Sequence, residues 1–171
     1  MLHLYMGDGK GKTTAAIGLL VRAAGAGKKV VFAQFMKGRD TSELAVLCNI
    51  PGVVVLRNDK DLGWFDSNNE EQAKAYTEVH NKILDEIETF ILNGQCDVLI
   101  LDEATYPYNY GIIDKKRLEA LIDNSPKEME IVITGRNADM FFASRADYIT
   151  NMEKLRHPYD QGVQARKGIE Y

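Results

Sequence analysis

The sequence predicts an α/β fold of three layers, in which helices cover both faces of a mostly parallel sheet. Short apolar runs alternate with longer amphipathic runs along all 171 residues, and this pattern is typical of strands that alternate with helices. The order is clearest at the start, where strand-like residues 2–6, helical residues 12–26 closed by Gly27, and strand-like residues 29–35 follow one another. Because a helix between two strands is the usual parallel crossover, this order indicates a parallel strand pair.

The remaining elements have local signals of their own. A long helix is predicted after Ser67, which can form a capping box with Glu70, and the dipeptide at 93–94 ends this helix. Asp114 can cap a short helix that runs to residue 122. The apolar side chains of the long helix share one face, namely Tyr76, Val79, Ile83, Leu84, Ile87 and Ile91. Further strands are expected at 53–56, 98–101, 130–134 and 148–152.

Composition favours one compact domain over residues 1–171, with 45% hydrophobic residues and a formal net charge of -4. Lys and Arg are scattered, so no basic stripe for a nucleic-acid backbone is expected. No apolar run approaches the ~20 residues that span a bilayer, and strand-like residues begin at Leu2, which leaves no room for a signal peptide. We therefore expect a cytoplasmic protein without nucleic-acid or membrane partners. Cys48 and Cys96 lie in apolar runs and are expected to be buried structural residues.

The strongest chemical signal is a glycine-rich loop between the first strand and the first helix. Its glycines let successive amide groups point inward, the following helix offers its positive end, and Lys12 supplies a point charge to phosphate oxygens. Thr13 would then bind magnesium. Met6 stands where the common form of this motif has its first glycine, and Lys10 is either a second phosphate contact or a solvated side chain. The expected nucleotide-binding residues are Gly7, Asp8, Gly9, Lys10, Gly11, Lys12, Thr13 and Thr14.

A second motif is the apolar run over 96–103, which ends in Asp102 and Glu103. In phosphate-loop proteins an acid at this place faces a magnesium ion, and we expect the strand to lie beside the loop strand, with both ending at one edge of the sheet. The alternative is an ordinary strand followed by a helix N-cap, where acids are common. Together, the loop and the acids predict a P-loop NTPase (RecA-like) fold with a metal site at Thr13, Asp102 and Glu103.

The loop before the long helix carries the only tryptophan, Trp64, next to Phe65. Exposed rings at this place could cover a flat ligand, whereas the alternative is that both rings pack into the core. The guanine-reading pattern Asn-Lys-x-Asp is absent, since residues 58–61 do not fit it, and a GTPase is therefore disfavoured. His80 lies on the long helix, where a partly exposed structural role is expected.

The ordered motifs of the chain resemble those of the ATP:corrinoid adenosyltransferases, which make adenosylcobalamin. The resemblance runs from the first strand to the last residue, and this family also lacks the first glycine of the loop. The matching segments are Gly7 to Gly18, Gln34-Phe35-Met36-Lys37-Gly38, Leu101-Asp102-Glu103, Thr134-Gly135-Arg136 and the tail from His157 to Tyr171.

The resemblance implies a reaction in which the corrinoid cobalt, reduced to Co(I), attacks the ribose C5′ carbon of ATP and expels triphosphate. The metal would be Mg²⁺ or Mn²⁺. Lys12 and Glu103 would be the catalytic residues. Arg22 would be a further phosphate contact, with an ordinary surface charge as the alternative. Trp64 and Phe65 would be the corrinoid-binding rings.

The resemblance also implies a homodimer and a reducing flavoprotein that supplies Co(I). Either the partner subunit or the C-terminal tail would cover the corrinoid, or the corrinoid would be covered less completely. Two alternatives stand beside this interpretation. A P-loop small-molecule kinase would need a base near its acceptor hydroxyl, and a regulatory nucleotide-binding module would need no second substrate pocket.

Overall fold

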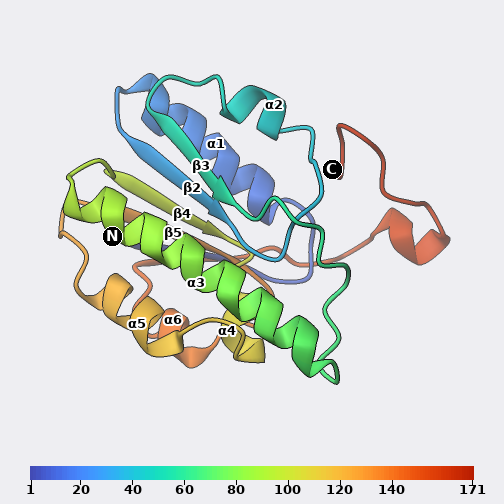
Figure 1. Ribbon diagram of the computed structural model, residues 1–171. Coiled ribbons are helices and arrows are strands. Elements are labelled where there is room, and N and C mark those ends of the chain that lie inside the picture. The colour runs from blue at the N-terminus through green and yellow to red at the C-terminus, as the bar shows by residue number, and fades with distance from the viewer.

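The computed structural model describes residues 1–171 and has the three layers that the sequence predicts (Figure 1). Six parallel strands form one sheet in the order β3-β2-β4-β5-β1-β6. The strands are β1 (Leu2–Met6), β2 (Val30–Gln34), β3 (Val53–Arg57), β4 (Val98–Asp102), β5 (Glu130–Gly135) and β6 (Tyr148–Asn151). The helices are α1 (Lys12–Gly25), α2 (Leu44–Leu47), α3 (Glu70–Leu92), α4 (Thr105–Tyr110), α5 (Lys115–Asp123), α6 (Met140–Ala143) and the 3-10 helix η1 (Pro158–Gln161). No helix combines the length and the apolar character needed to cross a membrane.

Helices cover both faces of the sheet. α1 and α2 lie on one face, and α3 to α6 lie on the other (Figure 1). Side chains alternate between the faces along β4, because successive residues of a strand point to opposite sides. Leu99 and Leu101 join the core beneath α3, and Val98 and Ile100 join the core beneath α1. All five residues of β4 are buried, which explains why this run is apolar up to its last residue, Asp102.

β5 lies between β4 and the loop strand β1, so the expectation that β4 and β1 are neighbours is wrong. Both strands still end at the same edge, because every strand pair is parallel. Thr134 of β5 is level with Tyr5 of β1, and Ile133 just before it is level with Leu101 of β4. Thr134 therefore stands between the glycine-rich loop and Asp102.

The long helix α3 begins at Glu70, but its cap differs from the predicted capping box of Ser67 and Glu70. Asn69 is the N-cap, and its side-chain oxygen accepts from the Gln72 amide at 3.0 Å. The Gln72 side chain reaches back and accepts from the Asp66 amide at 2.7 Å. Gln72, and not Glu70, is therefore the side chain that binds a backbone amide before the helix. A turn in which the Asn69 amide donates to the Asp66 carbonyl oxygen precedes the helix. Because this turn includes Ser67, that residue cannot be the cap.

Two side chains differ in burial from the expectation. Cys48 is exposed, because it follows the short helix α2, on which only Leu47 is buried. Cys96 is buried, as predicted. His80 is 1% exposed instead of partly exposed, because it lies on the face of α3 that packs toward β2, with its ring centroid 5.5 Å from that of Phe35.

Candidate nucleotide-binding site

The glycine-rich loop joins β1 to α1, and its conformation gathers polar groups. Gly11 is the N-cap of α1 with a φ of 114°, which only glycine adopts without strain, and no side chain caps this helix terminus. The Lys12 side chain is buried, and its Nζ donates to the carbonyl oxygens of Gly7 and Gly9, each at 2.7 Å. The loop therefore holds a positive charge beside the positive end of a helix, an arrangement that suits phosphate.

The chain that follows β6 packs directly against this loop. The Gly9 amide donates to the Met152 carbonyl oxygen at 2.6 Å. A Cβ atom on Gly9 would lie 2.6 Å from that oxygen and 2.8 Å from the Glu153 carbonyl oxygen. Both distances are far below a carbon–oxygen van der Waals contact, so only glycine fits here.

Gly9→Ala is expected to destabilise the protein by about 1–3 kcal/mol, because the loop or residues 152–153 must move to admit the methyl group. Gly18→Ala is the matched control: nothing lies within 4 Å of a Cβ atom at Gly18, and alanine favours the helix α1. Thermal unfolding followed by circular dichroism measures both variants. A Gly9→Ala protein that melts with the parent would contradict the close packing of the loop.

Asp102, the last residue of β4, is fully buried and accepts from four side chains. Its Oδ1 accepts from the Thr13 hydroxyl group at 2.8 Å and from the Thr134 hydroxyl group at 2.7 Å. Its Oδ2 accepts from Gln34 Nε2 at 3.2 Å and from Lys37 Nζ at 3.4 Å. The structure thus brings together Thr13 and Asp102, two of the predicted metal-binding residues.

Three residues of this network, Gln34, Lys37 and Thr134, belong to segments that carry the family resemblance but were not predicted to be site residues. Their place in the motifs 34–38 and 134–136 is the signal that could have found them. Gln34 ends β2, Lys37 follows it, and Thr134 is the penultimate residue of β5. All three thus lie at the carboxyl edge of the sheet, where ligands of α/β proteins bind.

Glu103 follows β4 in a left-handed conformation with a φ of 62°, which is uncommon for a residue with a side chain. Its amide donates to the Thr134 hydroxyl oxygen at 2.9 Å. Burial raises the pKa of Glu103, and the neighbouring Asp102 carboxylate raises it further. Burial also lowers the pKa of Lys12. A ligand of opposite charge stabilises the charged form of each group, namely a cation for Glu103 and a phosphate for Lys12.

Thr13, Asp102 and Glu103 offer oxygen atoms from one hydroxyl group and two carboxylates. Mg²⁺ and Mn²⁺ prefer such ligands, and Mg²⁺ at nucleotide sites is usually held by one or two carboxylates together with substrate phosphates. One hydroxyl group and two carboxylates leave coordination positions for phosphate oxygens, so this donor set fits a divalent cation that is shared with a nucleotide.

One cavity of about 660 Å³ is lined by Thr13 and Glu103, whereas Asp102 is buried and does not line it. Its lining includes loop residues 8–14, Lys37, Glu103 and Arg136, whose Nε lies 3.6 Å from the Asp8 carboxylate. The C-terminal tail leaves the sheet after β6 and returns toward α2 (Figure 1), where the Ser42 hydroxyl group donates to the Tyr171 carbonyl oxygen at 2.9 Å. The last residues of the chain, Gly168, Ile169, Glu170 and Tyr171, thereby line the cavity across from the loop.

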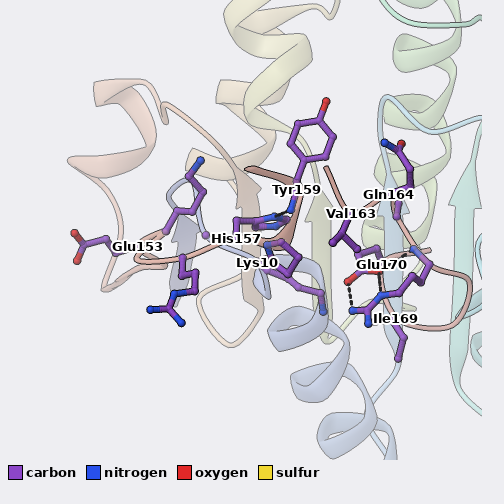
Figure 2. Close-up of a pocket in the computed structure, with 14 residues that line it drawn as sticks. Lys10, Glu153, His157, Tyr159, Val163, Gln164, Ile169 and Glu170 are labelled. Atoms are coloured by element: carbon purple, nitrogen blue, oxygen red, sulfur yellow. Dashed lines mark hydrogen bonds and ion pairs between the residues drawn. The ribbon is translucent and has the colours of Figure 1, made fainter. Parts of the chain in front are cut away.

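A second cavity of about 420 Å³ lies between the loop and the tail (Figure 2). Lys10, His157 and Tyr159 are among the residues that line it, and the ion pair of Arg166 and Glu170, at 3.0 Å, closes the turn of the tail beside it. Lys10 lines both cavities. A phosphate contact by Lys10 therefore stays a prediction, with a contact to the tail as the other role that its position allows.

The other predicted site residues lie away from the phosphate loop. Arg22 is in the last turn of α1, roughly 15 Å along the helix axis from Lys12, so the structure does not bring it to the loop. Trp64 is 88% exposed in the segment between β3 and α3. Phe65 instead packs against Tyr76 and Tyr110, with centroid separations of 5.6 and 4.9 Å. The alternative in which both rings pack into the core is therefore wrong for Trp64.

A glycine-rich loop between β1 and α1, set at the same edge as the carboxylates that end β4 in an all-parallel sheet, defines a P-loop nucleotide-binding protein. Comparison with known sequences gives the family within this class. The family model described as "ATP:corrinoid adenosyltransferase BtuR/CobO/CobP" matches residues 1–171. The chain belongs to the ATP:corrinoid adenosyltransferase family.

Relatives from several bacteria are similar over the whole chain. The corrinoid adenosyltransferase of Escherichia coli (strain K12) is 31% identical over 173 residues, which cover 100% of this chain and 85% of that protein. Corrinoid adenosyltransferase CobA of Salmonella typhimurium (strain LT2) is also 31% identical, with 100% and 85% covered. The corrinoid adenosyltransferase of Pseudomonas aeruginosa is 28% identical over 172 residues, with 100% and 83% covered. The similarity therefore includes the tail as well as the loop.

Proposed function

We propose that the chain transfers the 5′-deoxyadenosyl group of ATP to the Co(I) centre of a corrinoid, in adenosylcobalamin biosynthesis or salvage. The cobalt electron pair forms a bond to the ribose C5′ carbon, the bond between C5′ and its oxygen breaks, and triphosphate leaves with that second electron pair. Cobalt is thereby formally oxidised from Co(I) to Co(III). The observation that carries the proposal is a phosphate-loop cavity in a chain whose full length, residues 1–171, matches this family.

In this reaction the phosphate loop binds the triphosphate that leaves, and no phosphate group is transferred. We expect the amide groups of residues 7–14 and the Lys12 ammonium group to stabilise the negative charge that develops on triphosphate as the C5′ bond breaks. Thr13, Asp102 and Glu103 would hold Mg²⁺ or Mn²⁺, which supplies further positive charge to the phosphate oxygens. Because the nucleophile belongs to the corrinoid, the protein needs no general base.

The products of the reaction test this proposal. The protein is incubated with ATP, Mg²⁺ and chemically reduced cobalamin or cobinamide, and the corrinoid spectrum and the released phosphates are analysed. Adenosylated corrinoid with an equal amount of triphosphate supports the proposal. A P-loop kinase would release ADP, and a regulatory module would show no turnover; either result would sink the proposed reaction.

Trp64 and Phe65 are proposed to contact the corrinoid and to help remove its lower axial ligand, which eases the reduction of Co(II). Trp64→Ala is expected to slow adenosylcobalamin formation from Co(II) with a biological reductant by about tenfold. Its melting temperature should equal that of the parent, because Trp64 is 88% exposed and its removal leaves no internal cavity. A Trp64→Ala protein that reacts from Co(II) as fast as the parent would rule out this role.

We further propose that residues 1–171 act as one domain, that the protein forms a homodimer, and that a flavoprotein supplies the reduced corrinoid. One sheet that runs from β1 to β6 supports the first point. The reduction of Co(II) to Co(I) takes an electron that ATP does not supply, which supports the third. Sedimentation velocity tests the dimer, and replacement of the chemical reductant by a reduced flavoprotein tests the electron donor.

A further inference from the structure

Lys37 lines the cavity of about 660 Å³ beside the glycine-rich loop. The proposed reaction assigns no role to its positive charge. Lys37 follows β2, whose last residue, Gln34, is level with Asp102 of β4. Its Nζ lies 3.4 Å from Asp102 Oδ2 and 4.0 Å from Glu103 Oε1. The Lys37 side chain is 31% exposed and lines the same cavity as Lys12. Its charge therefore stands beside the carboxylates and is open to a ligand in the cavity.

The backbone that carries Lys37 is held from two sides. Met36 has a left-handed φ of 59°, which is unfavourable for a residue with a side chain and needs support from its surroundings. The Met36 amide donates to His80 Nε2 of α3 at 3.4 Å. From the other side, Arg57 Nη2 of β3 donates to the Lys37 carbonyl oxygen at 3.4 Å. These hydrogen bonds fix the turn that directs Lys37 to the cavity.

His80 has the surroundings of a residue that holds this turn. Its Nδ1 lies 2.8 Å from the Ile112 carbonyl oxygen, which can only accept, so Nδ1 carries the ring proton and Nε2 accepts from Met36. Burial lowers the pKa of His80 to about 4, which keeps the ring neutral near pH 7. The rings of Phe35 and Tyr76 pack against it, each with its centroid at 5.5 Å. His80 is thus fixed in position and in protonation state.

The charges around Lys37 point to a phosphate ligand. Once Asp102 and Glu103 face the divalent cation of the proposed site, that cation balances much of their negative charge. Lys37, whose side chain is 31% exposed, then has an excess of positive charge that faces the cavity. Arg136, by comparison, has a carboxylate partner in Asp8 at 3.6 Å. Glu43 also lines the cavity but forms no ion pair with Lys37, whose two carboxylate partners are Asp102 and Glu103. The anion that the proposed reaction places in this cavity is the triphosphate of the nucleotide.

We propose that Lys37 is a further contact to the triphosphate of ATP and that His80 is the positioning residue that holds its turn. The identity of the ligand rests on the proposed function. Lys37, in the turn that follows β2, and Lys12, at the start of α1, would each bring one positive charge to the same leaving group. If Lys37 served only to offset the buried charge of Asp102, its loss would change stability and leave phosphate affinity unchanged.

Binding of tripolyphosphate, measured by isothermal titration calorimetry with and without Mg²⁺, tests the assignment. Lys37→Met keeps the apolar stem and removes the charge, and it is expected to weaken binding about 10- to 100-fold. Lys37→Arg should regain part of the loss. Lys82→Met is the matched control, since Lys82 is exposed on α3. A Lys37→Met protein that binds tripolyphosphate as tightly as the Lys82→Met protein would overturn the assignment.

The role of His80 is tested in the same assay. His80→Asn keeps a donor for the Ile112 carbonyl oxygen and loses the acceptor for the Met36 amide. We expect it to weaken tripolyphosphate binding about threefold to tenfold in the parent and not at all in the Lys37→Met background, because coupled residues are not additive. Equal losses in both backgrounds, or a lower melting temperature with unchanged affinity, would show that His80 does not act through Lys37.

The proposed adenosyl transfer and the proposed contact between Lys37 and triphosphate can be refuted independently of each other. Adenosylcobalamin formation by the parent is measured beside the calorimetry. If the parent binds tripolyphosphate and Lys37→Met does not, the contact stands even where no adenosylcobalamin forms, and only the proposed reaction falls. If the parent makes adenosylcobalamin and Lys37→Met matches it in tripolyphosphate affinity, only the contact falls.

Discussion

Lys12→Met is expected to lower the rate of adenosyl transfer from ATP to reduced cobalamin by a factor of roughly 100 to 1,000. The Lys12 Nζ is fixed by hydrogen bonds of 2.7 Å to the carbonyl oxygens of Gly7 and Gly9. A charge that is already in place when negative charge develops on the leaving group needs no reorganisation during the reaction. Methionine keeps most of the apolar stem, so the change removes the charge and little packing. The initial rate with excess Co(I) and saturating ATP measures the effect.

The control for this variant lies outside the cavity. Lys82→Met removes a charge from an exposed side chain of α3, and its effect on the rate is expected to be much smaller. Lys12→Met should unfold at a somewhat lower temperature than the parent, since two carbonyl oxygens lose a donor, at about 1 kcal/mol each. Circular dichroism establishes that the variant is folded. A folded Lys12→Met protein with a rate close to that of Lys82→Met would refute the leaving-group role.

The elements next to the phosphate loop were predictable from the sequence because their signals are local. β1 spans Leu2–Met6, as predicted, and α1 and β4 end within one residue of the predicted bounds. A strand that is buried on both faces is apolar throughout, and glycines bound α1 on both sides. The meeting of Thr13 and Asp102 was also predictable, because parallel strands present their carboxyl ends at one edge.

The features that the sequence could not reveal depend on contacts between distant residues. Nothing local places β5 between β4 and β1, because strand order is set by how the crossover helices pack. The left-handed turn at Met36 could not be predicted, because no glycine marks it in the sequence. It is supported by His80, 44 residues further along the chain. The tail has no helical or strand period, and its return to the loop is seen in the bond from Ser42 to Tyr171, 129 residues away.

Asp102→Asn is expected to lower adenosyl transfer by roughly 100-fold or more at low Mg²⁺, with only a moderate loss of stability. The stability argument rests on the partners of Asp102. An asparagine oxygen can still accept from the hydroxyl groups of Thr13 and Thr134, which lie 2.8 and 2.7 Å from Oδ1. The new amide nitrogen would meet Gln34 Nε2, but Gln34 Oε1 is buried without a hydrogen-bond partner. Rotation of the Gln34 amide therefore supplies an acceptor.

Asparagine can replace the hydrogen bonds of Asp102 but not its negative charge. Lys37 loses a carboxylate that lies 3.4 Å from its Nζ. The divalent cation of the proposed site would lose one of its two carboxylate ligands, so the Mg²⁺ concentration for half-maximal rate should rise about tenfold or more. Magnesium titration of the rate and Mn²⁺ binding followed by electron paramagnetic resonance measure this shift. Asp8→Asn is the control, because the Asp8 side chain is 70% exposed on the same loop. If Asp102→Asn kept the Mg²⁺ dependence of Asp8→Asn, Asp102 would be a partner of the hydroxyl groups alone, and the cation would have to bind elsewhere.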